Sequence, residues 1–272
     1  MAESREMTVA RQAARAGGEV VARYFREGVA MRSKDVSNLV SDADVESEHA
    51  IVGVIRHAFP DHEVLGEEAH AGDTSAEHLW VVDPLDGTNN FAHHIPQCAV
   101  SVAYYRAGVP QVGVIFNPIR DEWHEAERDR GATFNGAIAR VGEEDRLDQA
   151  LVGVGFYYER GAVVTATLDA IGILKRREKI HGIRRFGSAT LDLCMVGLGM
   201  LGAYFEYTLA PWDFAAGRLF VEEAGGRVTT CTGNPLPLAQ SHILASNGRL
   251  HDAMLAVVRA HIPPPGSSTM VI

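Results

Sequence analysis

The spacing of hydrophobic residues changes along this chain, and each change predicts a different kind of element. In the first 60 residues apolar side chains recur at steps of three and four, which is typical of amphipathic helices. They predict a helix over residues 3–27 that ends near Gly28, and a second over 44–58 that Pro60 terminates. From Val64 to about Phe134, short apolar runs between turn residues predict a mostly antiparallel sheet.

The second half of the chain alternates between strand-like and helix-like segments. Such alternation predicts a layered α/β unit. Strands are expected over residues 150–156, 182–187, 203–208, 226–230 and 242–247, and helices over 162–177, 189–198 and 212–224, followed by a closing helix. No linker or internal repeat separates the halves. We therefore expect one domain over residues 1–263, with an α+β half to about 145, an α/β half from 146, and a disordered tail over 264–272.

Composition narrows the class of protein. The net charge of −10 argues against broad electrostatic attraction to nucleic acid or to an anionic membrane. The three cysteines are widely spaced, which predicts neither a disulfide framework nor a zinc site. No apolar run reaches the roughly 18 residues that a membrane span needs. We expect a soluble, cytoplasmic protein that has no membrane partner and no direct contact with nucleic acid.

The segment W-V-V-D-P-L-D-G-T-N-N-F, residues 80–91, drives an apolar strand into two carboxylates. Pro84 restricts the backbone on both sides, so that Asp83 and Asp86 can converge. Carboxylates held that close favour a hard cation such as magnesium, manganese or calcium. The following Gly87 and Thr88 read as a helix start, where free N–H groups bind anions. The alternative is an ordinary type I turn at a strand end with a solvated Asp.

Other acidic residues also stand at the ends of apolar elements. Glu67 and Glu68 follow a short apolar strand, and Asp213 reads as the N-cap of a helix whose small residues permit close backbone approach. Asp42 and Asp44 stand at another helix start. Taken alone, Asp213, Asp42 and Asp44 are explained by capping or by the helix dipole. Their repetition favours one shared metal and phosphate site.

Three motifs together resemble a known family. They are G-E-E at 66–68, D-P-L-D-G-T-N-N-F at 83–91 and W-D-F-A-A-G-R-L-F-V-E-E-A-G-G at 212–226, with smaller matches at 34–44, 134–136 and 181–190. In this order and spacing they resemble the inositol monophosphatase family of magnesium-dependent, lithium-sensitive phosphatases, over about residues 5–262. The resemblance implies an αβαβα layered sandwich of the inositol monophosphatase and fructose-1,6-bisphosphatase type, and a homodimer.

The resemblance also implies roles for particular residues. One metal ion would be held by Glu67, Asp83 and the carbonyl of Leu85, and a second by Asp83, Asp86 and Asp213. A third, weaker ion would lie near Glu67, giving two or three Mg²⁺ ions, with Mn²⁺ as a possible substitute. Asp44 and Thr88 would orient and deprotonate the attacking water, with Glu67 as a further catalytic residue. The implied substrate contacts are Asp86, Gly87, Thr88, Gly187, Ser188, Glu206 and Asp213.

The implied activity is hydrolysis of a small polyol phosphate, with myo-inositol 1-phosphate as the expected substrate. Glu206 matches a carboxylate that accepts hydrogen bonds from ring hydroxyls, although a surface charge at a strand end is the alternative. Histidinol phosphate, a fructose bisphosphate and 3′-phosphoadenosine 5′-phosphate remain alternative substrates. The non-enzymatic alternative is a protein that docks to a nucleic-acid machine.

Overall fold

The computed structural model describes residues 3–28, 32–33, 39–156 and 161–263. The expected disordered tail, 264–272, lies outside the described residues, as does most of the first small motif, at 34–38. Among the described residues, no helix has the length and apolar character needed to cross a membrane.

A large sheet occupies the first half of the chain. In the described residues it has seven strands in the order β3-β4-β5-β6-β7-β8-β9. Strands β3 and β4 are parallel, and every later neighbour is antiparallel, as the sequence predicts. The strands are β3 (Glu63–Gly66), β4 (His78–Asp86), β5 (Ala99–Arg106), β6 (Val109–Asn117), β7 (Glu122–Glu127), β8 (Gly131–Phe134) and β9 (Ala137–Ile138).

A second sheet lies in the second half. The described residues give it five strands in the order β11-β10-β12-β14-β13. Strand β10 is parallel to both neighbours, whereas β14 is antiparallel to β12 and β13. The strands are β10 (Leu151–Val154), β11 (Gly182–Arg184), β12 (Ala203–Leu209), β13 (Arg227–Thr229) and β14 (Ser241–Ser246). A short antiparallel pair, β1 (Arg32–Ser33) and β2 (Leu39–Val40), stands apart from both sheets.

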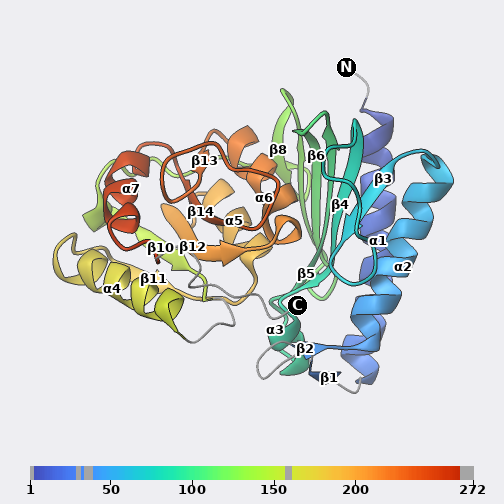
Figure 1. Cartoon of the computed structure of the whole chain (residues 1–272), viewed down its shortest axis with the longest axis horizontal. Coiled ribbons are helices and arrows are strands. Elements are labelled where there is room, and N and C mark those ends of the chain that lie inside the picture. Colours follow the sequence, from blue (N-terminus) through green and yellow to red (C-terminus); the bar gives the residue numbers. More distant parts are fainter. Residues whose placement is uncertain (1–2, 29–31, 34–38, 157–160, 264–272) are drawn as a thin grey trace.

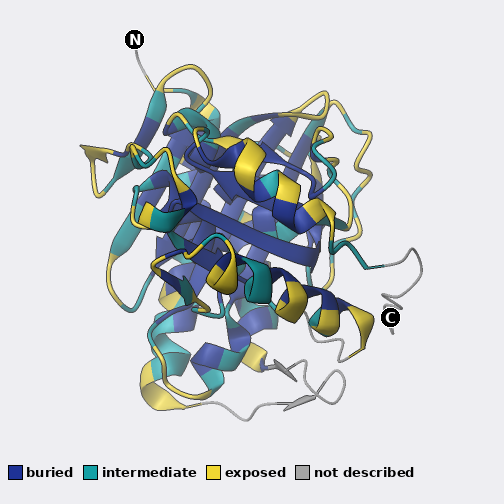
Figure 2. Cartoon of the chain, turned by 90° about the vertical axis from the view of Figure 1, so that its left-hand side faces the viewer, coloured by how far each residue is buried: buried dark blue, intermediate teal, exposed yellow. Residues whose placement is uncertain are grey.

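Helices enclose and separate the two sheets (Figure 1). Helices α1 (Arg5–Glu27) and α2 (Asp42–Ala58) pack on the outer face of the large sheet. Helix α6 (Pro211–Glu223) contacts both sheets, with α5 (Ala189–Gly197) beside it, and α4 (Ala162–Arg176) and α7 (His251–Arg259) cover the far face of the small sheet. This order confirms the predicted αβαβα sandwich. Figure 2 shows the burial pattern of these layers, with largely buried strands behind helices that are exposed along one side.

Close packing of α6 on the large sheet fixes the start of that helix. A Cβ at Gly113 of β6 would lie 2.9 Å from the carbonyl oxygen of Ala216, so only glycine permits this approach. Next to it, the Tyr105 hydroxyl donates a hydrogen bond to the carbonyl of Ala215 at 3.1 Å. The small residues of α6 predicted this contact. It sets the helix that carries Asp213 firmly against strands β5 and β6.

Candidate functional site

Strand β4 continues through the D-P-L-D segment. Its pairing with β5 shifts register between Asp83 and Asp86, which is where Pro84 can be accommodated because it has no N–H to donate. The chain leaves the strand only at Gly87, whose φ of +87° begins the short helix α3 (Thr88–Ala92). The alternative of a type I turn over these residues is therefore wrong.

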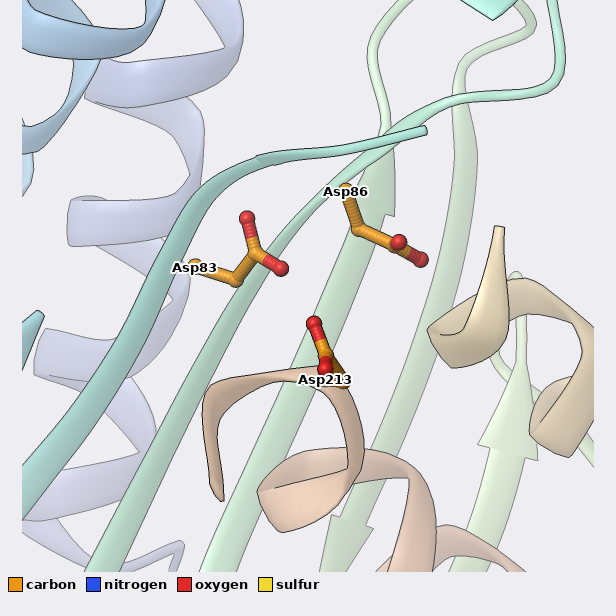
Figure 3. Close-up of side chains that lie close together, drawn as sticks. All are labelled: Asp83, Asp86 and Asp213. Carbon is orange, nitrogen blue, oxygen red and sulfur yellow. The ribbon is translucent and has the colours of Figure 1, made fainter. Parts of the chain in front are cut away.

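Three carboxylates converge where β4 ends and α6 begins. In the described part of the chain, Asp83, Asp86 and Asp213 each offer an oxygen within 4.8 Å of the others. Figure 3 shows the three side chains lying close together, two from the β4 segment and one from α6. Oxygen donors clustered in this way suit a hard divalent cation.

The structure corrects the place of Asp213 in its helix. Helix α6 begins at Pro211 with Ala210 as its N-cap, so Asp213 is the third helical residue and not the cap. Proline fits the first helical position because its missing N–H would have no partner there, and the helix therefore starts earlier than expected. Asp213 Oδ2 instead accepts the backbone N–H of Ala210 at 2.7 Å.

The cluster is electrostatically strained without a cation. Burial, followed by the negative charges of Glu67, Asp86 and Asp213, raises the pKa of Asp83 well above its usual range. Burial and the charges of Asp86 and Glu67 raise the pKa of Asp213 in the same way. A divalent ion would remove this repulsion, so the donor set fits Mg²⁺ or Mn²⁺.

Neighbours from the second half of the chain hold Asp86 in place and partly offset the effect of its burial. Burial raises its pKa, but hydrogen bonds from Ser188 and Thr190 oppose the rise. Asp86 Oδ2 accepts from Ser188 Oγ at 2.5 Å and from the Thr190 N–H at 2.8 Å. Ser188 is also the N-cap of α5. The helix start is thereby fixed to the carboxylate.

Glu67 and Leu85 lie at the edge of this cluster. Glu67 follows β3 and is half-buried, and it is not one of the three converging carboxylates, although its charge acts on Asp83 and Asp213. The N–H of Leu85 donates to Asp83 Oδ1 at 3.0 Å, and its carbonyl accepts from the Thr88 hydroxyl at 3.0 Å.

Asp44 and Thr88 meet beside the cluster. Asp44 Oδ2 accepts from the backbone and the hydroxyl of Ser41, the N-cap of α2, at 2.8 Å each. Its other oxygen lies 3.4 Å from the Thr88 hydroxyl, which is nearer to Leu85. Burial raises the pKa of Asp44 to about 6. The pair has the geometry to relay a proton once Thr88 turns from Leu85 to Asp44.

A polar pocket opens next to the carboxylates, lined by residues of both halves of the chain. It contains every predicted substrate residue: Asp86, Gly87, Thr88, Gly187, Ser188, Glu206 and Asp213. Glu206 is only 6% exposed, which overturns the interpretation as a surface charge. Its carboxylate accepts the Tyr204 hydroxyl at 2.5 Å, and burial raises its pKa to about 7.

Comparison with known proteins decides the family. Residues 3–263 match the model of the inositol monophosphatase family. The chain belongs to this family. The resemblance drawn from the three motifs is thus confirmed for nearly the whole sequence.

Relatives within the inositol monophosphatase family carry two kinds of name. The chain is 38% identical over 265 residues to the Nus factor SuhB of Pseudomonas aeruginosa, covering 95% of this chain and 97% of that protein. It is 38% identical to the chloroplastic phosphatase IMPL1 of Arabidopsis thaliana, covering 92% and 68% respectively. The solved inositol monophosphatase of Anabaena superposes with a TM-score of 0.83 at 36% identity, covering 97% of this chain and 98% of that one.

Sequence reasoning missed some residues of this family member's pocket. Asp192 of α5 lines it, and Asp192 Oδ1 is one of the few buried side-chain atoms in the described residues without a hydrogen-bond partner. Burial and the charges of Asp86 and Glu206 raise its pKa to about 8. Arg185 and Tyr204 line the same pocket. For Asp192, the sequence did contain a signal, because it is a lone acid inside the otherwise apolar helix A-T-L-D-L-C-M-V.

Proposed function

We propose that this chain is a metal-dependent phosphomonoesterase that hydrolyses a small polyol phosphate, with myo-inositol 1-phosphate as the favoured substrate. The observation that carries the proposal is the convergence of Asp83, Asp86 and Asp213 at the edge of a polar pocket. Membership of the inositol monophosphatase family supports it, as do the relatives named as phosphatases.

The residues that would hold the ions are Glu67, Asp83, Asp86, Asp213 and the carbonyl of Leu85, for two or three Mg²⁺ or Mn²⁺ ions. When bound, such ions neutralise a phosphate and acidify a water molecule. The carboxylate of Asp86 is held in position by its bonds from Ser188 and Thr190. The chain thus offers an ion-binding edge that needs no rearrangement of Asp86.

Asp44 and Thr88 would orient the attacking water and take its proton. The Thr88 hydroxyl lies between Leu85 and Asp44, so it can donate its proton to one of them while a lone pair accepts from water. Because a hydroxyl is a weak base, the final proton acceptor in this scheme is the Asp44 carboxylate. Thr88 therefore acts as the relay.

Glu206 would accept hydrogen bonds from hydroxyl groups in the alcohol part of the substrate. Its carboxylate is buried, faces the pocket and is fixed by Tyr204. A buried acceptor left without a donor costs binding energy, so substrates with a hydroxyl at this position are favoured. Gly187 has a φ of +83°, and a Cβ there would crowd Asn90 at 3.1 Å, so glycine shapes the wall of the pocket.

Phosphate release from a substrate panel tests the proposal. The panel holds myo-inositol 1-phosphate, histidinol phosphate, fructose 1,6-bisphosphate, 3′-phosphoadenosine 5′-phosphate and an aryl phosphate, each with and without Mg²⁺. We expect Glu206→Ala to raise KM for the polyol substrate but to leave aryl phosphate hydrolysis near the wild-type rate. Glu19→Ala, at an exposed site on α1, is the control. An equal loss on both substrates would assign Glu206 a purely structural role.

A second candidate function is docking to a nucleic-acid machine, which the relatives named as Nus factors favour. We expect an immobilised chain to retain transcription proteins from its own lysate if this function is present, and to do so equally well as the Asp213→Asn variant. Retention of nothing beyond background would remove this candidate. A homodimer, also proposed from the family, is tested by sedimentation.

A further inference from the structure

Helix α2 carries a buried carboxylate that the mechanism above does not use. Glu48 is completely buried. Its Oε2 accepts the N–H of Glu68 at 2.8 Å, and its Oε1 accepts the N–H of Ala69 at 2.8 Å and approaches Nδ1 of His70 at 2.6 Å. With Nδ1 of His70 as the donor, all three contacts are hydrogen bonds that this carboxylate accepts. Both oxygens are therefore used on one short segment.

That segment is the one that follows Glu67. The N–H of Gly66 donates to the carbonyl of His70 at 2.7 Å, which closes residues 66–70 into a compact loop. A Cβ at Gly66 would lie 2.5 Å from Glu48 Oε2, so the loop and the carboxylate are fitted to each other. The backbone on both sides of Glu67 is thus fixed.

The same helix also contacts the other parts of the site. Asp44 lies one turn before Glu48 and approaches Thr88. Ser47 donates to the carbonyl of Pro84 at 2.9 Å, between Asp83 and Asp86. Since a helix is rigid over one turn, α2 sets the position of the Glu67 loop relative to the end of β4.

We propose that Glu48 and His70 are positioning residues, which set the affinity of the site for its divalent ion by holding Glu67 in place. The inference rests on the metal-binding part of the proposed function. Neither residue is assigned as a ligand. Groups that orient ligands in this way change metal affinity by about 10- to 100-fold when they are removed.

Binding of Mn²⁺ to the full chain without substrate tests this, with free Mn²⁺ measured by electron paramagnetic resonance. Glu48→Gln places an amide N–H₂ against a backbone N–H, so we expect the Kd of the tightest Mn²⁺ site to rise by about 10-fold. Glu46→Gln, at a half-exposed site on the same helix, is the matched control and should bind like the wild type.

A double-mutant cycle separates positioning from general structure. If Glu48 acts through Glu67, adding Glu48→Gln to Glu67→Gln should cause no further loss of Mn²⁺ affinity. Additive losses, or an unchanged Kd in Glu48→Gln, would overturn the proposal. An unchanged Kd in Glu67→Gln would overturn it too, while leaving the phosphatase proposal on the three aspartates intact.

The His70 variants keep the test decisive if Glu48→Gln does not fold. His70→Asn places an amide N–H₂ near the position of Nδ1–H and should bind Mn²⁺ like the wild type, whereas His70→Ala should bind it several-fold more weakly. The same Kd for both variants would contradict the role of this donor. Because no turnover is measured, absence of phosphatase activity does not affect the outcome.

Discussion

Asp83 lies at the end of a buried strand, and the charges that act on it, from Glu67, Asp86 and Asp213, are negative. Burial and this repulsion raise its pKa, so the cation-free protein retains a proton where a free aspartate would be ionised. A divalent ion would replace that proton. The stability of the protein should therefore depend on the metal.

Replacing Asp213 with Asn tests the cluster at this scale. In wild type, Mg²⁺ at 100 times its Kd should stabilise the fold by about 2.7 kcal/mol. This stabilisation raises the melting temperature of the wild type, and we expect Asp213→Asn to lose most of that rise. In EDTA the variant should melt at or above the wild type, because one repelling charge is gone.

The matched control for that experiment is Asp169→Asn, at an exposed position on α4. It should respond to Mg²⁺ like the wild type in a thermal melt. A full Mg²⁺ response in Asp213→Asn would contradict the assignment of this carboxylate as a ligand.

Glu206 predicts a particular pH dependence of stability. Its pKa is raised to about 7 in the folded protein, so between the usual glutamate range and pH 7 the unfolded state has lost a proton that the folded state keeps. The free energy of unfolding must then fall as the pH rises. From pH 5 to 8, wild type should lose about 1 to 3 kcal/mol relative to Glu206→Gln in urea unfolding. Parallel pH profiles would show that Glu206 ionises normally.

At the scale of elements, the contact between β6 and α6 links the fold to the site. Gly113→Ala should push the carbonyl of Ala216 away and cost about 1 to 3 kcal/mol of unfolding free energy. Because α6 carries Asp213, the Mg²⁺ concentration for half-maximal stabilisation should also rise. Gly53→Ala is the control, since a Cβ on this exposed residue of α2 meets nothing within 4 Å. Equal effects of both substitutions would rule out the coupling.

Elements were predictable where the side-chain period was clear. The helix expected over 162–177 is observed as Ala162–Arg176, and the strand expected over 203–208 as Ala203–Leu209. One error arose at a proline, because Pro211 starts α6 two residues before the predicted cap, Asp213. At Pro84 the predicted convergence of Asp83 and Asp86 is observed.

The acids at element ends were predictable, whereas residues defined by packing were not. Glu48 shares the buried face of α2 with Val52 and Ile55, a signal that a charge lies inward at that point. Asp192 and Arg185 gain their meaning only when α5 is placed against the end of β4. No local pattern contains that placement.

At the scale of the whole molecule, the pocket is closed by bonds between segments that are distant in sequence. Asn90 of α3 donates to the carbonyls of Gln97 and Phe186 at 2.8 and 2.7 Å, and Ser188 donates to Asp86. These bonds bring the second half of the chain to the carboxylates of the first. The pocket therefore exists only when both sheets are in place.

The most direct test of this account is the release of inorganic phosphate from myo-inositol 1-phosphate by the full chain, measured in EDTA and across a Mg²⁺ titration. The account predicts no release in EDTA and a saturable rise with Mg²⁺ that added EDTA reverses. Equal release with and without the metal, or none at any Mg²⁺ concentration, would contradict it.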